Sequence, residues 1–208
     1  MSEEAKETAR IEAFSDGVFA IAITLLVLDM KVPSSTDLPA DVRLISVLGK
    51  QWPTYLAYVT SFLTILIMWV NHHRLFQHIR HTDQVFLMLN GLLLMGVTIV
   101  PFPTGLVAEY LHHREAMMAA AFYSGCFVVI AIFFNVLWRY ASHRGRLLGR
   151  NYDAHVVSAI SRQYRFGPVM YAVAFAAAFI SVTASVGICL GLACFFAVPS
   201  SGRAGRMV

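Results

Sequence analysis

Residues 10–30 read RIEAFSDGVFAIAITLLVLDM, and this stretch decides the fold. Between residues 17 and 28 it contains no charged side chain. A helix of about 20 residues crosses the ~30 Å hydrocarbon core of a bilayer. The rest of the chain agrees, because 58% of its 208 residues are hydrophobic and only 13% are charged, whereas soluble domains hold about 25% charged residues. The composition therefore predicts an all-α membrane protein.

Further apolar stretches complete a single membrane domain over residues 1–208. The predicted transmembrane helices are residues 11–30, 53–70, 85–107, 116–138, 166–183 and 185–198. We expect Pro101 and Pro103 to interrupt the third, because proline cannot continue the helical hydrogen bonding. The last two share one apolar block of 33 residues, which we divide near Thr183–Ser185. Each span must be helical, since lipid cannot satisfy an open backbone.

Basic side chains are distributed unevenly between the two ends of these spans. With six spans, 12 of the 16 Lys and Arg residues fall on the side that holds both termini. The other four are Lys31, Arg43, Lys50 and Arg114. Cytoplasmic loops carry the excess of basic residues, so we expect a multi-pass protein of the cell membrane with both termini in the cytoplasm.

The basic run from Arg139 to Arg165 belongs to the same side. Such a run could bind RNA or anionic lipid. The charge count favours a partly helical segment that sets the topology and lies on the inner leaflet. We therefore expect the lipid bilayer, and no nucleic acid, as a partner.

Asp16 stands out because a carboxylate within a membrane helix costs about 2.5–3.5 kcal/mol at the helix centre and less near an end. Such residues usually face the protein interior or water. Three interpretations stay open: a buried, hydrogen-bonded aspartate that locks helices together, a direct role in ion or proton passage, and an interfacial position without function.

The pattern Arg10-x-x-x-Phe14-Ser15-Asp16, followed by an apolar helix, resembles the transmembrane protein 175 family. Its animal member is a potassium channel of endosomes and lysosomes with two six-helix repeats, and bacterial members have one. This chain, with one motif and six predicted spans, resembles the bacterial type. The resemblance implies a homotetramer around a central pore lined by the first helix, permeable to potassium and other monovalent cations. It also implies no carbonyl-ring filter, and the sequence contains no TVGYG.

One face of the first helix is the candidate pore lining. Ile21, Leu25 and Leu28 recur at i, i+4 and i+7, and Thr24 adds a hydroxyl beside them. By the family pattern, Ile21 forms an apolar constriction and Thr24 the polar ring above it, so potassium is expected near both. An apolar ring closes by dewetting. Ordinary packing against lipid or core is the alternative.

A second set of residues is expected to brace this helix. Trp69, His72 and His73 end the second span at the depth of Ser15 and Asp16, and Asn90 begins the third at the same depth. We expect a histidine to contact Asp16, with His72 and His73 as competing candidates. Phe14 should face neighbouring helices. The resemblance assigns the bracing network to Arg10, Ser15, Asp16, His73 and Asn90.

Other functions are weaker. A secondary transporter or proton-coupled carrier using Asp16 and His73 is the alternative, although the sequence shows no internal inverted repeat. No nucleophile elbow, P-loop or HExxH occurs, so we do not expect an enzyme. Cys126, Cys189 and Cys194 lie in apolar segments without metal-binding spacing. We expect no cofactor beyond the permeant ion.

Overall fold

The computed structural model describes residues 3–33, 43–149 and 152–197. Its elements in chain order are α1 (Glu3–Leu25), η1 (Leu26–Asp29), α2 (Leu44–Lys50), α3 (Trp52–Phe76), α4 (Gln84–Ile99), α5 (Pro101–Tyr110), α6 (Ala116–Ser142), η2 (His143–Gly145), α7 (Ala154–Ala178) and α8 (Val182–Ala197). Within these residues the extended structure is an isolated bridge between Ile79 and Leu148. The described chain is thus helical throughout.

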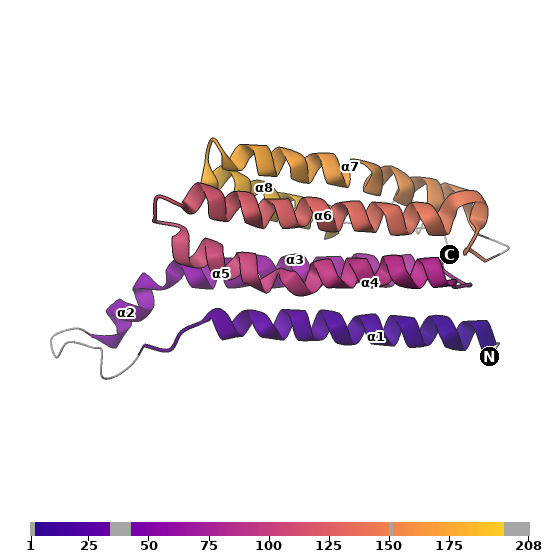
Figure 1. Cartoon of the computed structure of the whole chain (residues 1–208), viewed down its shortest axis with the longest axis horizontal. Helices are drawn as coiled ribbons and strands as arrows, with labels where there is room; N and C mark the ends of the chain where they lie inside the picture. The colour runs from indigo at the N-terminus through magenta and orange to yellow at the C-terminus, as the bar shows by residue number, and fades with distance from the viewer. Residues whose placement is uncertain (1–2, 34–42, 150–151, 198–208) are drawn as a thin grey trace, which may run out of the picture.

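The long helices lie side by side in an elongated bundle (Figure 1). α1 forms one side of it and packs on α3 and α4. α6, α7 and α8 pack on one another on the opposite side, while α3, α4 and α5 lie between the two. The short α2 lies apart, at the end of the bundle away from the N-terminus. α1 is therefore a peripheral helix of the single chain.

Four helical stretches are long and apolar enough to cross a membrane, namely Glu7–Leu28, Trp52–Phe76, Gln84–Tyr110 and Ala116–Gly145. α8 is apolar but has only 16 residues, and α7 carries Arg162 and Arg165 in its first half. The chain is therefore a multi-pass helical membrane protein.

The start of α1 and the ends of α3 and α6 lie at one end of the bundle (Figure 1). The Arg74 guanidinium, near the end of α3, lies 3.4 Å from the carbonyl oxygen of Ala197, the last residue of α8. The loops that follow α3 and α6 lie at this end too, because Tyr140 donates a 2.6 Å hydrogen bond to Asp83. We call this end of the bundle the terminal end.

Several boundaries differ from the sequence prediction. α7 begins at Ala154 rather than 166, because the Asp153 carboxylate accepts hydrogen bonds from the N–H groups of His155 and Val156 and caps the helix. The break before α8 falls before Val182 rather than at 183–185, since the Ser181 hydroxyl accepts from the N–H of Ala184. α3 runs on to Phe76, beyond the predicted end at residue 70. α2 was not predicted.

The third span is interrupted at Pro101, as expected for proline. α4 ends at Ile99 and α5 begins at Pro101, because proline has no N–H to donate to the preceding turn. The first span also changes character, since its α-helix ends at Leu25 and continues as a 3₁₀ turn to Asp29. Leu28 therefore lies just beyond the regular α-helical spacing of Ile21 and Leu25.

Candidate functional site

α1 has a buried face and an uncovered face. Ser15, Phe19, Ala22 and Leu26 recur at i, i+4, i+7 and i+11, and all four are buried. This spacing forms one stripe along a helix. Because α1 packs on α3 and α4, the stripe fixes which way the remaining α1 side chains point.

The uncovered face carries the predicted pore residues. Ile21 is 58% exposed and Leu28 is 73% exposed, and both Leu25 and Thr24 are exposed as well. The Thr24 hydroxyl donates a 2.8 Å hydrogen bond to the carbonyl of Ile21 in its own helix. Its oxygen lone pairs therefore remain available on the outer side. A face of this kind must meet lipid, another copy of the chain or a water-filled path.

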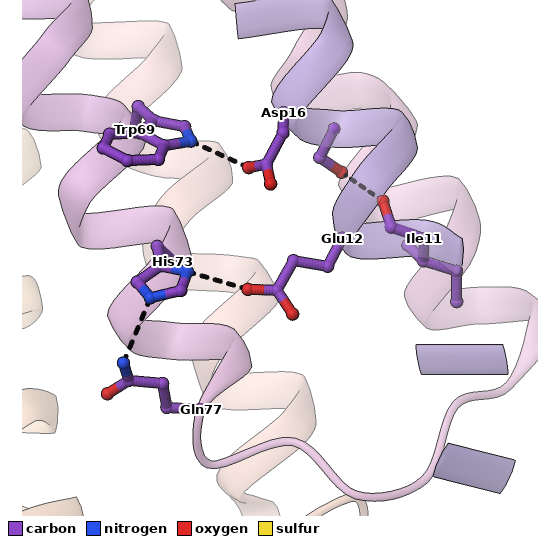
Figure 2. A network of polar contacts seen from close by, with 7 residues as sticks. Ile11, Glu12, Asp16, Trp69, His73 and Gln77 are labelled. Atoms are coloured by element: carbon purple, nitrogen blue, oxygen red, sulfur yellow. Dashed lines mark hydrogen bonds and ion pairs between the residues drawn. The ribbon is translucent and has the colours of Figure 1, made fainter. Parts of the chain in front are cut away.

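Two carboxylates of α1 meet two aromatic side chains of α3 (Figure 2). Trp69 Nε1 donates a 2.7 Å hydrogen bond to Asp16 Oδ1. His73 Nδ1 lies 2.8 Å from Glu12 Oε1. Glu12 and Asp16 lie four residues apart on α1, and Trp69 and His73 lie four residues apart on α3. The two contacts therefore form successive rungs between antiparallel helices, an upper rung at Asp16 and a lower rung at Glu12.

The lower rung has an additional polar neighbour. Gln77 Nε2 lies 3.1 Å from His73 Nε2 (Figure 2). With the Gln77 amide as donor, Nε2 accepts and Nδ1 carries the proton that faces Glu12. The imidazole of His73 also stacks on Trp69 at 5.9 Å between ring centroids, which joins the two rungs.

Asn90 of α4 links α1 and α3 through a buried chain of hydrogen bonds. Its Nδ2 donates to Ser15 Oγ at 3.0 Å, and Ser15 Oγ donates to the carbonyl of Ile11 at 2.8 Å. Its Oδ1 lies 2.8 Å from His72 Nε2. Because an amide oxygen only accepts, His72 Nε2 carries the hydrogen. Ser15, His72 and Asn90 are each at most 2% exposed.

Aromatic rings fix the His72 side chain. It stacks on Phe76 at 4.5 Å and meets Phe19 of α1 at 5.3 Å. Among the described residues its Nδ1 has no hydrogen-bond partner. His72 is therefore held in a packed site as a single-donor imidazole.

The predicted bracing residues divide into two networks. The structure brings Ser15, His72 and Asn90 together, and it joins Asp16 to Trp69. The expected hydrogen bond between a histidine and Asp16 is corrected, because His72 binds Asn90 and His73 binds Glu12.

Two motif residues lie outside both networks. The Arg10 side chain is exposed, and Phe14 is 66% exposed rather than packed on helices of its own chain. Phe14 is therefore largely uncovered by its own chain, and among the described residues Arg10 takes no part in the hydrogen bonds that hold α1.

Glu12 is the residue that the sequence prediction missed. A signal was present, because the four-residue spacing of Glu12 and Asp16 matches that of Trp69 and His73 on the next helix.

Within residues 3–33, 43–149 and 152–197, no group of three or more His, Cys, Asp or Glu side chains is placed to hold a metal ion.

Residues 10–101 match the family model for the endosomal/lysosomal potassium channel TMEM175. A potassium channel of Chamaesiphon minutus is 58% identical over 198 residues, which cover 95% of this chain and 97% of that protein. The chain belongs to the TMEM175 family. The resemblance predicted from the motif at Arg10–Asp16 is thereby confirmed, and the family is one of ion channels rather than enzymes.

Two further comparisons fit this assignment. The crystal structure of a lysosomal potassium-selective TMEM175 homolog from Chamaesiphon minutus superposes with a TM-score of 0.85 at 56% identity, covering 94% of this chain and 99% of that one. The endosomal/lysosomal proton channel TMEM175 of Bos taurus is 44% identical over 97 residues, which are 44% of this chain and 20% of that protein. The Bos taurus relative is therefore similar over a limited segment.

Proposed function

We propose that this protein is a potassium-permeable cation channel, formed by four chains around a central pore lined by α1. The observation that carries the proposal is the division of α1 into a buried face and an uncovered face. Ile21, Thr24, Leu25 and Leu28 lie on the uncovered face of a helix that forms one side of the chain. The family membership and the named potassium-channel relatives support the same ion path.

The constriction in this proposal is a ring of four Ile21 side chains. An apolar constriction holds water poorly, so it closes by dewetting and opens by widening. The Thr24 hydroxyls next to it offer oxygen atoms to a partly dehydrated cation, since each hydroxyl hydrogen is used within its own helix. With no carbonyl-ring filter, selectivity for potassium over sodium is modest.

The contacts to α3 and α4 hold the rotation of α1 about its axis. One residue along an α-helix turns the side-chain direction by about 100°, so a slip of one position would turn Ile21 away from the pore. The rungs at Asp16 and Glu12 and the chain through Asn90 oppose such a slip. Bracing is thus the proposed role of the motif.

The proposed topology has six crossings with both termini in the cytoplasm of the cell. α7 and α8 then supply the fifth and sixth spans. At 1.5 Å per residue, α8 is about 24 Å long, a little shorter than the hydrocarbon core, and the bilayer can thin locally to match it. The basic residues near the terminal end favour its cytoplasmic placement.

Potassium flux into liposomes tests the channel. We expect purified protein to support flux, and Ile21→Asn to increase it, because a polar ring retains water. Val169→Asn is the matched control, since Val169 is an equally uncovered apolar residue on α7. Absence of flux in both the original protein and Ile21→Asn would contradict the proposal.

A proton-coupled carrier is the second candidate. Proton passage is supported by the name of the Bos taurus relative, a proton channel, and the two hydrogen-bonded carboxylates on α1 are groups that a carrier could protonate. Asp16→Asn keeps an oxygen for Trp69 but cannot carry a proton. If this change abolishes transport and leaves the oligomer intact, the carrier is favoured; unchanged potassium flux favours the channel.

A further inference from the structure

A groove between α6 and α7 lies on the opposite side of the bundle from α1. Its volume is about 600 Å³, and its lining includes the side chains of Arg139, His143, Arg146 and Arg165. All four are exposed. None of the described residues that line the groove is acidic. The groove is therefore a concentrated positive site at the terminal end.

The floor of this groove contains polar groups that are hydrogen-bonded to one another. Trp138 is fully buried, and its Nε1 donates a 2.9 Å hydrogen bond to Ser161 of α7. Asn135 Nδ2 donates to the carbonyl of Tyr164 at 2.8 Å. These bonds tie α6 to α7, and the exposed arginines of the groove remain available to a ligand.

Arg146 is positioned by its own neighbours. Its guanidinium carbon lies 4.9 Å from the centre of the Tyr140 ring, a stacking arrangement that arginine favours. The nearby Asp83 carboxylate already accepts hydrogen bonds from the Tyr140 hydroxyl and from the N–H of Phe86. Asp83 interacts electrostatically with Arg146, and the other two arginines of the groove, Arg139 and Arg165, leave it a net positive charge.

Apolar side chains continue the groove towards the other end of the bundle. On α6, Val136 and Ile132 lie three and seven residues before Arg139, which places them on its face. On α7, Val169 lies four residues after Arg165. All three are between 41% and 62% exposed. The charged part of the groove at the terminal end matches the head of a phospholipid, and the apolar part farther along the bundle matches its acyl chains.

We propose that this groove binds the phosphate of an anionic phospholipid from the adjacent leaflet. The planar guanidinium donates paired hydrogen bonds to phosphate oxygens, and basic pockets between membrane helices on the cytoplasmic side recognise anionic headgroups. The site requires that the chain lies in a bilayer with the terminal end on the cytoplasmic side. It does not depend on the proposed ion path along α1.

Native mass spectrometry of the detergent-purified oligomer tests the site. Phosphatidic acid and phosphatidylcholine are the probes, and Arg139→Gln combined with Arg165→Gln is the test variant. We expect phosphatidic acid to bind the original protein and to bind the variant about thirtyfold more weakly, since each of the two arginines near the membrane surface contributes about 1 kcal/mol and about 1.4 kcal/mol is a factor of ten. Phosphatidylcholine should bind weakly to both.

A matched control separates the groove from overall charge. Arg114→Gln combined with Arg162→Gln removes the same charge from exposed residues outside the groove, and we expect it to bind as the original protein does. Equal binding by all three proteins, or an equal loss in the control, would overturn the proposal. Displacement of the lipid by millimolar inorganic phosphate would assign the groove to a free anion instead.

Protein stability and potassium transport are measured separately from lipid binding. The thermal unfolding temperature of each variant shows whether it is intact, and a variant that unfolds early is replaced by Arg139→Lys with Arg165→Lys. Lysine keeps the charge but loses the paired hydrogen bonds, so we expect intermediate binding. Lipid-binding data of this kind stand whether or not the protein conducts potassium.

Discussion

Asn90 of α4 donates a 3.0 Å hydrogen bond to the hydroxyl of Ser15 on α1, across 75 positions of the sequence. The same amide accepts from His72 of α3. One buried side chain therefore joins three helices, and each of its bonds is made where water is excluded. This junction fixes α1 against the rest of the chain.

We expect Asn90→Leu to destabilise the protein. It leaves Ser15 Oγ without a donor and the His72 Nε2 hydrogen without an acceptor, and each buried unsatisfied group costs about 1–3 kcal/mol. The measurement is the thermal unfolding temperature of the detergent-solubilised protein. Thr98→Val is the control, because the Thr98 hydroxyl is exposed and bonds only within α4. Equal unfolding temperatures would show that the junction contributes nothing.

Trp69→Phe should remove the hydrogen bond to Asp16 while keeping an aromatic ring. The lost bond ends on a carboxylate, and such bonds contribute about 1.5–3 kcal/mol. A double-mutant cycle with Asp16→Ala measures the coupling. We expect the effect of Trp69→Phe to shrink when Asp16 is already absent. Additive effects would mean that Trp69 acts through packing alone. Trp52→Phe, exposed at the other end of α3, should leave stability unchanged.

Asp83 predicts a pH dependence at the terminal end. Burial alone would raise its pKa, but the hydrogen bonds from Tyr140 and from the N–H of Phe86, with Arg146 nearby, lower the pKa below 3.8. A depressed pKa stabilises the fold above the unfolded value, and this stability is lost as the pH falls through the folded value.

Asp83 caps the N-terminus of α4, where its carboxylate accepts from the N–H of Phe86. Asp83→Ala should therefore lower the unfolding temperature near neutral pH, because an N-cap contributes about 0.5–2 kcal/mol. The difference from the original protein should shrink at about pH 3. Asp83→Asn, which retains a capping oxygen, should lose less at neutral pH. A difference of the same size at both pH values would show that ionisation of Asp83 plays no part.

The helices around the site were predictable because long apolar runs are a strong signal in a membrane protein. The depth of Ser15 and Asn90 followed from counting residues along each span. The partners of His72 and His73, neither of which bonds Asp16, did not follow, since they depend on the rotation of α3, which packing with α1 and α4 decides. Sequence position alone gives depth but not direction.

Other details depended on single side chains. The start of α7 was missed because its first turns hold several polar and basic residues, and the Asp153 cap is visible only once the backbone is known. The end of the apolar block was divided in the wrong place because the Ser181 cap decides it. Glu12 was passed over because it precedes the apolar run.

Thiol modification tests the central claim most directly. In a background with Cys126, Cys189 and Cys194 replaced by Ala, Ile21→Cys and Val169→Cys are each reconstituted and treated with a charged thiol reagent. Modification at residue 21 should block potassium flux, because the added charge would lie in the pore, whereas modification at residue 169 should leave flux unchanged. Full labelling of Ile21→Cys without any loss of flux would contradict a pore lined by α1.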